Sequence, residues 1–260
     1  MTTVPSSLKV FITGASSGIG AALAAHYAAR GARLGLVARR RDVLAEIARG
    51  LPGEHALYAA DVADAQAMAG AAHDFMQRFG VPDIVIANAG VSVGTLTEHP
   101  EDVEVFERVM RTNVVGLAAT FQPFIAPMRA ARRGRLAGIS SVAGMRGLPG
   151  AGAYSASKAA AITYLEALRI ELRPSGVKVV TVCPGYVATP MTAVNKYRMP
   201  FILPADVAAR RIARVIDAGR RYAVVPWQMA LVARAMKLLP NAVYDRLFKR
   251  AGRKPRGLKL

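Results

Sequence analysis

Short apolar runs alternate with Ala-rich or amphipathic stretches along most of the chain. The apolar runs predict buried strands at residues 8–13, 33–38, 55–60, 83–88, 135–140, 177–183 and 222–225. The stretches between them predict helices at residues 18–30, 41–50, 64–79, 101–133, 153–173 and 204–219. Asp64 is a suitable N-cap, and we expect the longest helix to break near Thr112. Strands that alternate with helices of this length predict parallel βαβ units and a doubly wound α/β sheet.

The pattern changes after Val225. Residues 227–239 and 242–250 predict two short amphipathic helices separated by Pro240. Residues 251–260 are basic and contain two glycines and a proline, so we expect them to lack structure of their own. The chain is therefore divided into an α/β domain (1–225), a helical extension (226–250) and a basic tail (251–260).

Composition narrows the class of protein. A chain of 260 residues suits one α/β domain. The single cysteine, Cys183, excludes an internal disulfide and a zinc site built from cysteines, and we expect it to be buried for packing. No two of the four histidines have ligand spacing, so we predict no metal. Residues 1–8 have no secretory pattern, and no apolar run reaches the length needed to span a membrane. We therefore expect a cytosolic protein, and peripheral binding to a membrane surface is an open alternative.

The charge is strongly positive, at +18, and it is concentrated near the end of the chain. Residues 234–260 hold nine Lys or Arg and one acid, Asp245. Such a balance favours anionic partners, for example a phosphorylated cofactor, acidic lipid or nucleic acid. No nucleic-acid motif accompanies the charge, so nucleic acid is not expected.

A glycine-rich loop joins the first predicted strand to the first helix, with the sequence Thr-Gly-Ala-Ser-Ser-Gly-Ile-Gly at residues 13–20. Glycines at 14, 18 and 20 permit a tight turn, close approach to a phosphate and close strand–helix packing. The helix N-terminus then offers free N–H groups to a pyrophosphate. The strand before and the helix after make this reading stronger than that of an ordinary βα turn. The candidate phosphate-binding residues are Gly14, Ser16, Ser17, Gly18, Ile19 and Gly20.

This loop resembles the TGxxxGxG pattern of the short-chain dehydrogenase/reductase family, and the resemblance covers about residues 8–225. It implies a Rossmann sheet of seven strands in the order 3-2-1-4-5-6-7 and a homodimer or homotetramer. It also implies roles for three later segments. Asp61 and Val62 would meet the adenine, Asn88, Ala89 and Gly90 would lie against the adenosine ribose, and Pro184, Gly185, Val187 and Thr189 would hold the nicotinamide carboxamide.

The end of the second strand indicates which dinucleotide binds. An NAD enzyme places a carboxylate there for the ribose 2′-hydroxyl, but this chain has Ala38 followed by Arg39 and Arg40. A guanidinium can bind a 2′-phosphate with two hydrogen bonds, whereas a carboxylate would repel it. We therefore predict NADP(H) in preference to NAD(H).

Tyr154 and Lys158 stand four residues apart, so on a helix they share a face. A nearby ammonium favours phenolate and lowers the pKa of a tyrosine, as acid–base chemistry at a carbonyl requires. That pair alone is weak evidence for a catalytic site, because Tyr and Lys at this spacing usually form a surface pair. Ser141, thirteen residues before Tyr154, strengthens it because this is the family's spacing for a catalytic serine, whose hydroxyl can stabilise charge on the substrate oxygen. Asn113 matches the family's fourth catalytic residue, which holds a water leading from the lysine to solvent.

The resemblance implies that Tyr154 protonates a carbonyl oxygen while NADPH delivers hydride, with alcohol oxidation as the reverse. Lys158 would also bind the nicotinamide ribose, and Ser140 would support the strand. The region expected to line the substrate pocket is largely apolar and includes Met145, Tyr186 and Met191 with Ser141, so we expect a lipophilic carbonyl or alcohol.

Two alternatives to an enzyme are a dinucleotide-sensing regulator and a membrane-docked scaffold that uses the fold for binding only. For the extension, docking on an anionic membrane is one hypothesis. Packing on the domain or on a sister subunit is the favoured one, because amphipathic helices pack inward more often than on lipid.

Overall fold

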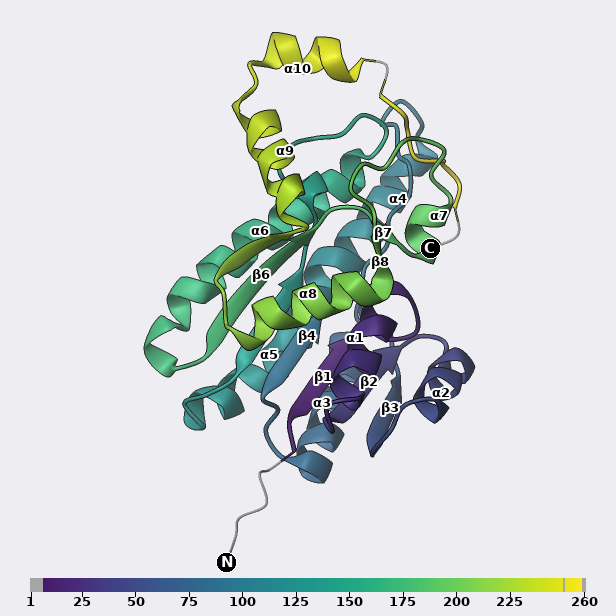
Figure 1. Cartoon of the computed structure of the whole chain (residues 1–260). Coiled ribbons are helices and arrows are strands. Elements are labelled where there is room, and N and C mark those ends of the chain that lie inside the picture. The colour runs from purple at the N-terminus through teal and green to yellow at the C-terminus, as the bar shows by residue number, and fades with distance from the viewer. Residues whose placement is uncertain (1–6, 250, 259–260) are drawn as a thin grey trace, which may run out of the picture.

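The computed structural model describes residues 7–249 and 251–258. Its centre is a sheet of seven parallel strands (Figure 1). In sequence order these are β1 (Lys9–Thr13), β2 (Arg33–Ala38), β3 (His55–Ala59), β4 (Ile84–Ala87), β5 (Arg135–Ile139), β6 (Lys178–Pro184) and β9 (Tyr222–Val225). Their order across the sheet is β3-β2-β1-β4-β5-β6-β9, which confirms the predicted doubly wound topology with β9 as the seventh strand.

Helices cover both faces of this sheet (Figure 1). On one face, α1 (Gly18–Ala28), α2 (Arg41–Arg49) and α8 (Ala205–Asp217) bury residues such as Leu23, Leu44 and Ile212. On the other, α3 (Ala65–Phe79), α5 (Gly116–Ala130) and α6 (Gly152–Glu171) form a second core. Strands buried on both sides explain why the apolar runs of the sequence are continuous.

A local signal marks the start of α3. The side chain of Asp64 accepts hydrogen bonds of 3.0 Å from the backbone N–H groups of Gln66 and Ala67, so the expected N-cap of α3 is present. The expected break near Thr112 is wrong. Helix α4 (Glu101–Met110) continues through a π-helical turn (Arg111–Val115) into α5. The π-helical turn holds one residue more than an α-helical turn, so the chain stays helical through this segment.

The helical extension is present as α9 (Trp227–Leu238) and α10 (Asn241–Phe248), at the top of Figure 1. Its inner side packs on the domain through Met229, Ala233 and Tyr244, all buried. Arg146 fixes the bend between the helices, because its guanidinium donates to the carbonyls of Met236 and Leu239, both at 2.6 Å. Packing on the domain, the favoured hypothesis for the extension, therefore holds for this inner side.

The tail has no helix or strand of its own over residues 251–258, but it is not detached from the domain. These residues lie against the domain, and Lys254 is only 8% exposed. The tail alone has too few apolar residues to fold, and its contacts with the domain supply what the composition argument left out. Residues 259 and 260 lie outside the described residues. None of the described helices is long and apolar enough to cross a membrane.

Candidate active site

A cleft runs along the carboxyl ends of the strands, which is where parallel α/β sheets bind their ligands. Two short pieces complete its rim, namely β7 (Val187–Ala188), paired with β8 (Leu203–Pro204), and α7 (Pro190–Ala193). The cleft brings together most of the residues predicted from sequence: Gly14, Ser16, Ser17, Gly18, Ile19, Arg39, Arg40, Asp61, Val62, Asn88, Ala89, Gly90, Ser141, Tyr154, Lys158, Pro184, Gly185, Val187, Thr189 and Met191.

The glycine loop is shaped as a cradle. Gly14 and Gly18 have φ of +68° and +55°, a region that other residues rarely adopt. A Cβ on Gly14 would lie 2.8 Å from the backbone of Ala89, and one on Gly18 would lie 3.1 Å from the Thr189 side chain. Gly20 lies outside the cleft lining, and a Cβ there would collide with the carbonyl oxygen of Gly14. These glycines keep the backbone at the α1 N-terminus bare, which fits a pyrophosphate.

Thr13 and Asn88 hold this loop in place. The Thr13 hydroxyl accepts hydrogen bonds from the backbone N–H groups of Asn88 (3.1 Å) and Ala89 (3.2 Å). The Asn88 amide donates to the carbonyls of Thr13 (3.0 Å) and Gly14 (3.3 Å). The ends of β1 and β4 are therefore tied together directly under the cleft.

The far end of the cleft is basic. Ala38 ends β2, and Arg39 and Arg40 follow it as exposed side chains on the cleft wall. Within the described chain, neither guanidinium forms an ion pair. Asp61 faces them from the end of β3, and one of its oxygens accepts a hydrogen bond of 2.9 Å from the Ala63 backbone N–H. At this end the arginines can bind an anionic group, and Asp61 can accept a hydrogen bond from a neighbouring planar polar ring.

Ser141, Tyr154 and Lys158 meet at the opposite end. Ser141 begins a 3₁₀ turn (Val142–Gly144) whose Gly144 packs so closely on α6 that a Cβ would lie 2.6 Å from the Lys158 backbone. The first turns of α6 present Tyr154 and Lys158 on one face, with the Lys158 Nζ 5.7 Å from the centre of the Tyr154 ring. Ser140, expected to support the strand, donates its hydroxyl proton to the Lys158 carbonyl at 2.8 Å.

Burial dominates the electrostatics of this group. Burial raises the pKa of Tyr154, and the neighbouring Ser141 hydroxyl opposes that shift. Burial also lowers the pKa of Lys158 to about 8, while its Nζ donates to the Ile139 carbonyl at 3.0 Å. The sequence argument expected the Lys158 ammonium to lower the pKa of Tyr154. In the structure, the largest cause of the Tyr154 shift is loss of solvent, which raises that pKa because it disfavours the charged phenolate. The Cys183 thiol, buried beside them, has its pKa raised to about 11 by burial.

Asn113 lies just behind the cleft, inside the π-helical turn. Its amide donates to the Val91 carbonyl and to the Ser157 hydroxyl, both at 2.9 Å, and its oxygen accepts from the Val91 N–H at 2.8 Å. The side chain therefore joins the turn to the segment after β4 and to α6. Its neighbour Thr112 lines the cleft instead.

Two residues predicted to contact the substrate, Met145 and Tyr186, lie outside the lining of this cleft. The Met145 sulfur accepts from the Tyr222 hydroxyl at 3.4 Å, and the Tyr186 ring lies 6.3 Å from that of Tyr197. Thr192 was missed, although it lines the cleft and its hydroxyl donates to the Val187 carbonyl at 2.6 Å. The Thr-Pro start of α7 was the available signal, because it marks a helix whose first turn is capped by its own threonines.

Metal ligands are not gathered in this region. Across residues 7–249 and 251–258, no three His, Cys, Asp or Glu side chains are placed to hold a metal ion.

Comparisons with known proteins define the class. The model of the short chain dehydrogenase family matches residues 9–199. An uncharacterized oxidoreductase of Myxococcus xanthus is 38% identical over 92% of this chain and 95% of its own. The "11-beta-hydroxysteroid dehydrogenase-like 3" of Arabidopsis thaliana is 36% identical over 90% and 78% of the two chains. A "cis-4-hydroxycyclohexanecarboxylate dehydrogenase" of Sinomonas cyclohexanicum is 35% identical over 78% and 79%. A short-chain dehydrogenase structure from Streptomyces avermitilis matches the fold with a TM-score of 0.76 at 24% identity, covering 96% and 97% of the two chains.

A Rossmann sheet with a glycine-lined cleft at its carboxyl edge defines a nucleotide-binding domain. The chain belongs to the short-chain dehydrogenase/reductase family, as its sequence resemblance indicated. It is accordingly an oxidoreductase whose cofactor is a nicotinamide dinucleotide.

Proposed function

We propose that this protein is an NADP(H)-dependent oxidoreductase that interconverts a lipophilic ketone or aldehyde and the corresponding alcohol, with Tyr154 as its acid/base. One observation carries the proposal: Ser141, Tyr154 and Lys158 converge at one end of a cleft whose other end is a glycine cradle beside Arg39 and Arg40, which form no ion pair within the described chain. A cofactor extended along the cleft would have its nicotinamide beside Tyr154 and its adenosine beside Arg39.

The residues divide the chemistry between them. NADPH, when bound, supplies the hydride. The raised pKa keeps the Tyr154 phenol protonated near neutral pH, and that is the form that can donate a proton to an oxygen gaining charge. The Ser141 hydroxyl stabilises charge on the same oxygen. Lys158 binds the nicotinamide ribose, and Asn113, held by Val91 and Ser157, holds a water that leads from Lys158 toward solvent.

Charge at the β2 end supports the choice of NADP(H). An unpaired guanidinium at Arg39 or Arg40 can bind a 2′-phosphate with two hydrogen bonds. Ala38 leaves no carboxylate to bind a 2′-hydroxyl or to repel that phosphate.

Apolar side chains beyond Tyr154 support a lipophilic substrate. Val91 and Met191 border this end of the cleft, and Tyr197 lies close by. Two relatives are named for a hydroxysteroid and for a hydroxycyclohexanecarboxylate, so both names specify an alcohol. We call residues 191–203 the lid. Lys196 and Arg198, which lie in this lid, could meet an anionic group on such a substrate.

The Tyr154→Phe variant tests this function. Removing one hydroxyl should lower kcat for the best substrate of a panel of lipophilic carbonyls and alcohols by at least about a hundredfold, while the Kd for NADPH stays unchanged. The Tyr164→Phe variant, which removes a hydroxyl further along α6, should keep full activity. Turnover that survives in Tyr154→Phe would show that another group is the acid. NADPH binding without turnover in the unaltered chain would favour the dinucleotide-sensing regulator.

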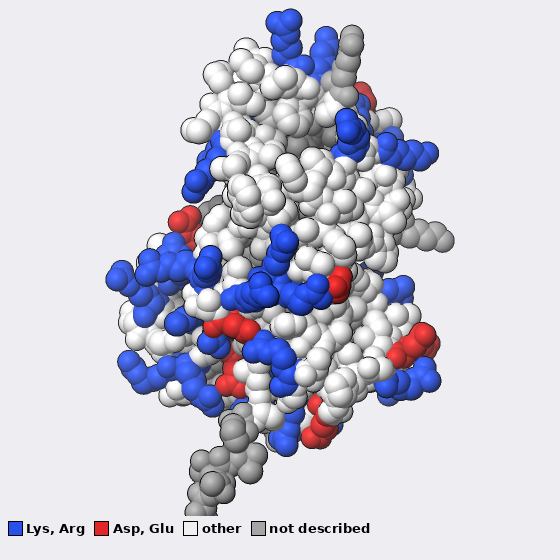
Figure 2. All heavy atoms as spheres, in the orientation of Figure 1, with Lys and Arg blue, Asp and Glu red and all other residues white. Residues whose placement is uncertain are grey.

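We also propose that the outer face of α9 and α10 docks on an anionic membrane. Large apolar side chains stand exposed there, with Trp227 at 65%, Leu231 at 56%, Leu238 at 83% and Leu247 at 63%. Positions 227, 231 and 238 share one side of α9 by helical spacing. Figure 2 shows a largely uncharged surface over this upper part of the molecule, with Lys and Arg at its edges.

Charge favours a membrane over a second copy at this face. The two helices hold Arg234, Lys237 and Arg246 against one acid, Asp245. A symmetric dimer would bring the same basic patch against itself, whereas anionic lipid would attract it. A homodimer or homotetramer, which we propose on family grounds, has other exposed apolar residues available, such as Val103 and Phe106 on α4 and Ile170 on α6.

A further inference from the structure

The end of the chain crosses the substrate side of the cleft as a strap, which we define as residues 251–258. In Figure 1 it descends as a yellow trace from α10, past α4, toward α7. It has no helix or strand, so its position depends entirely on contacts with the segments it crosses. Those contacts are specific, and they reach the loop after β4, the start of α4 and the segment that carries Met191 and Tyr197.

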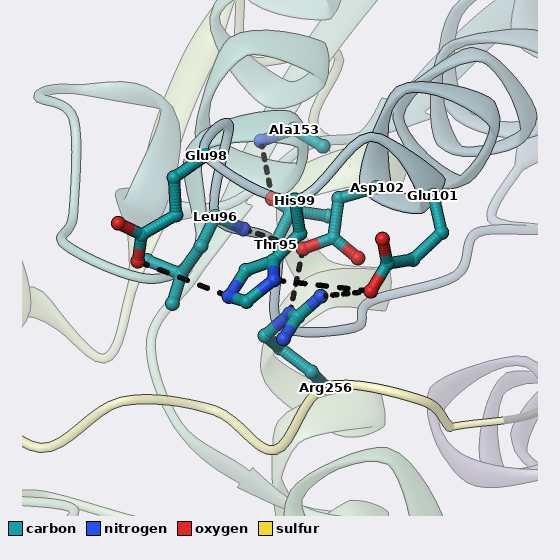
Figure 3. A network of polar contacts seen from close by, with 8 residues as sticks. All are labelled: Thr95, Leu96, Glu98, His99, Glu101, Asp102, Ala153 and Arg256. Atoms are coloured by element: carbon teal, nitrogen blue, oxygen red, sulfur yellow. Dashed lines mark hydrogen bonds and ion pairs between the residues drawn. The ribbon is translucent and has the colours of Figure 1, made fainter.

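The first contact is an ionic latch. The Arg256 Nε lies 2.7 Å from the Asp102 Oδ2, and its Nη2 lies 2.9 Å from the Glu101 Oε1 (Figure 3). The Asp102 side chain is only 6% exposed and also accepts a 2.7 Å hydrogen bond from the Leu96 backbone N–H. One arginine thus joins the strap both to the start of α4 and, through Asp102, to the loop that follows β4.

His99 belongs to the same cluster. Its Nδ1 lies 3.9 Å from Glu101 and its Nε2 lies 3.8 Å from Glu98 (Figure 3). Arg256 is the group that holds the pKa of Asp102 below its usual range, with the Leu96 hydrogen bond adding to the effect. Both Glu101 and Asp102 have lowered pKa values, so both are charged when they pair with Arg256 at neutral pH.

Backbone contacts continue on both sides of the latch. The Gly94 N–H donates to the Pro255 carbonyl at 2.9 Å, and a Cβ on Gly94 would collide with the carbonyl oxygen of Lys254. Leu258 packs on a small cluster that contains Val93 and Ala153. The glycine at 94 is thus required by the strap.

The strap also reaches the lid. The Lys254 side chain is buried, and its Nζ donates to the Met191 carbonyl at 2.9 Å. Met191 lines the cleft. Gly252 lies against Tyr197, since a Cβ at that glycine would collide with the tyrosine side chain. The strap therefore holds α7 and the lid from outside while it holds the loop after β4 from the other side.

We propose that the strap is the outer wall of the substrate compartment and that Arg256 is a specificity-determining positioning residue. The strap links the segments that carry Val91, Met191 and Tyr197, and so fixes how far these segments can part for a bulky substrate. This inference rests on the proposed function, because the compartment concerned is the one beside Tyr154. Arg256 does not touch the reacting atoms.

The Arg256→Gln variant in the full chain tests the proposal. Removing the latch should raise kcat/KM for the bulkiest ketones of a homologous series at least about tenfold relative to the smallest, mainly through KM, and leave the NADPH Kd unchanged. The Arg256→Lys variant should restore part of the original selectivity, because it keeps the charge. The Arg210→Gln variant is a matched control, since it breaks a 2.7 Å ion pair with Asp206 on the outer surface of α8.

Hydrogen–deuterium exchange separates failure of this proposal from failure of the proposed function, because it needs no turnover. In Arg256→Gln, the amides of residues 91–96 and 191–199 should exchange faster, while those of the glycine loop should not change. Unchanged exchange, or an unchanged size profile, would overturn the proposal. If Arg256→Gln does not fold, Glu101→Gln removes only the exposed partner and should shift exchange and selectivity in the same direction by less.

Discussion

Among residues 7–249 and 251–258, the buried ammonium of Lys158 has no carboxylate partner. Its Nζ donates to one backbone carbonyl, and burial lowers its pKa to about 8. A lysine in an unfolded chain titrates near pH 10.4. Between about pH 8 and 10.4 the unfolded state therefore binds more protons than the folded one, so stability rises with pH through this window. Below it, the folded state carries the full cost of the buried charge.

The Lys158→Met variant should therefore be more stable than the unaltered chain at pH 7, by roughly 3 kcal/mol, although it loses activity. The difference should shrink as the pH rises from about 8 to 10.4. Denaturant unfolding at several pH values measures it. Lys254, with a pKa also near 8, titrates in both proteins, so its contribution cancels in the difference in stability between them. A variant that is less stable at pH 7 would show that contacts of the ammonium outweigh its burial.

Single residues differ in how well the sequence predicted them. Ser141, Tyr154 and Lys158 could be placed in one site because their spacing matches a family pattern, and the structure brings them together. Met145 and Tyr186 lie outside the cleft lining, and the sequence could not show this, because proximity to a catalytic residue does not fix which way a side chain turns. The raised pKa of Tyr154 was also out of reach, since it depends on how much solvent the fold excludes.

Elements were predicted more reliably than their junctions. Strand β2 and strand β9 begin and end at the predicted residues, because apolar runs between polar ones specify buried strands well. The π-helical turn at 111–115 was not predicted, because its cause is tertiary: Asn113 bonds to Val91 and to Ser157 on other elements. The strap was missed for the same reason.

The turn from β2 to α2 carries the cofactor prediction. In the Arg39→Ser variant, the Kd for NADPH should rise at least about tenfold, because a charge-assisted pair is lost, and the Kd for NADH should change little. Fluorescence titration of both cofactors measures this. The Arg49→Ser variant, at the other end of α2, is the control. Equal losses for both cofactors would mean that Arg39 does not contact the 2′-phosphate.

At the scale of the whole molecule, two differently built attachments flank the domain. The helices α9 and α10 bury an inner side and expose an outer apolar one, whereas the strap has no regular structure and is held by polar contacts. The excess of basic charge is spread over both. Sequence composition indicated an anionic partner, but only the structure separates the residues available to a membrane from those already paired with Asp102 and Glu101.

Co-sedimentation with vesicles checks the membrane proposal. The protein should pellet with vesicles that contain anionic phosphatidylglycerol and not with neutral phosphatidylcholine, and salt should weaken the binding. The double variant Leu231→Glu, Leu238→Glu should bind at least about tenfold more weakly, since two apolar contacts are lost. Ile170→Glu, a similar change on α6, should bind normally. Equal pelleting of all three proteins would refute docking through this face.

The strap also separates two parts of the site in the order of synthesis. The described residues that line the cofactor cleft all precede position 193, whereas Lys254 and Arg256 are synthesised well after them. The latch proposed above can therefore form only after the whole lining of the cleft has been made. The part of the site proposed to set selectivity is added to a cleft whose own residues are already complete.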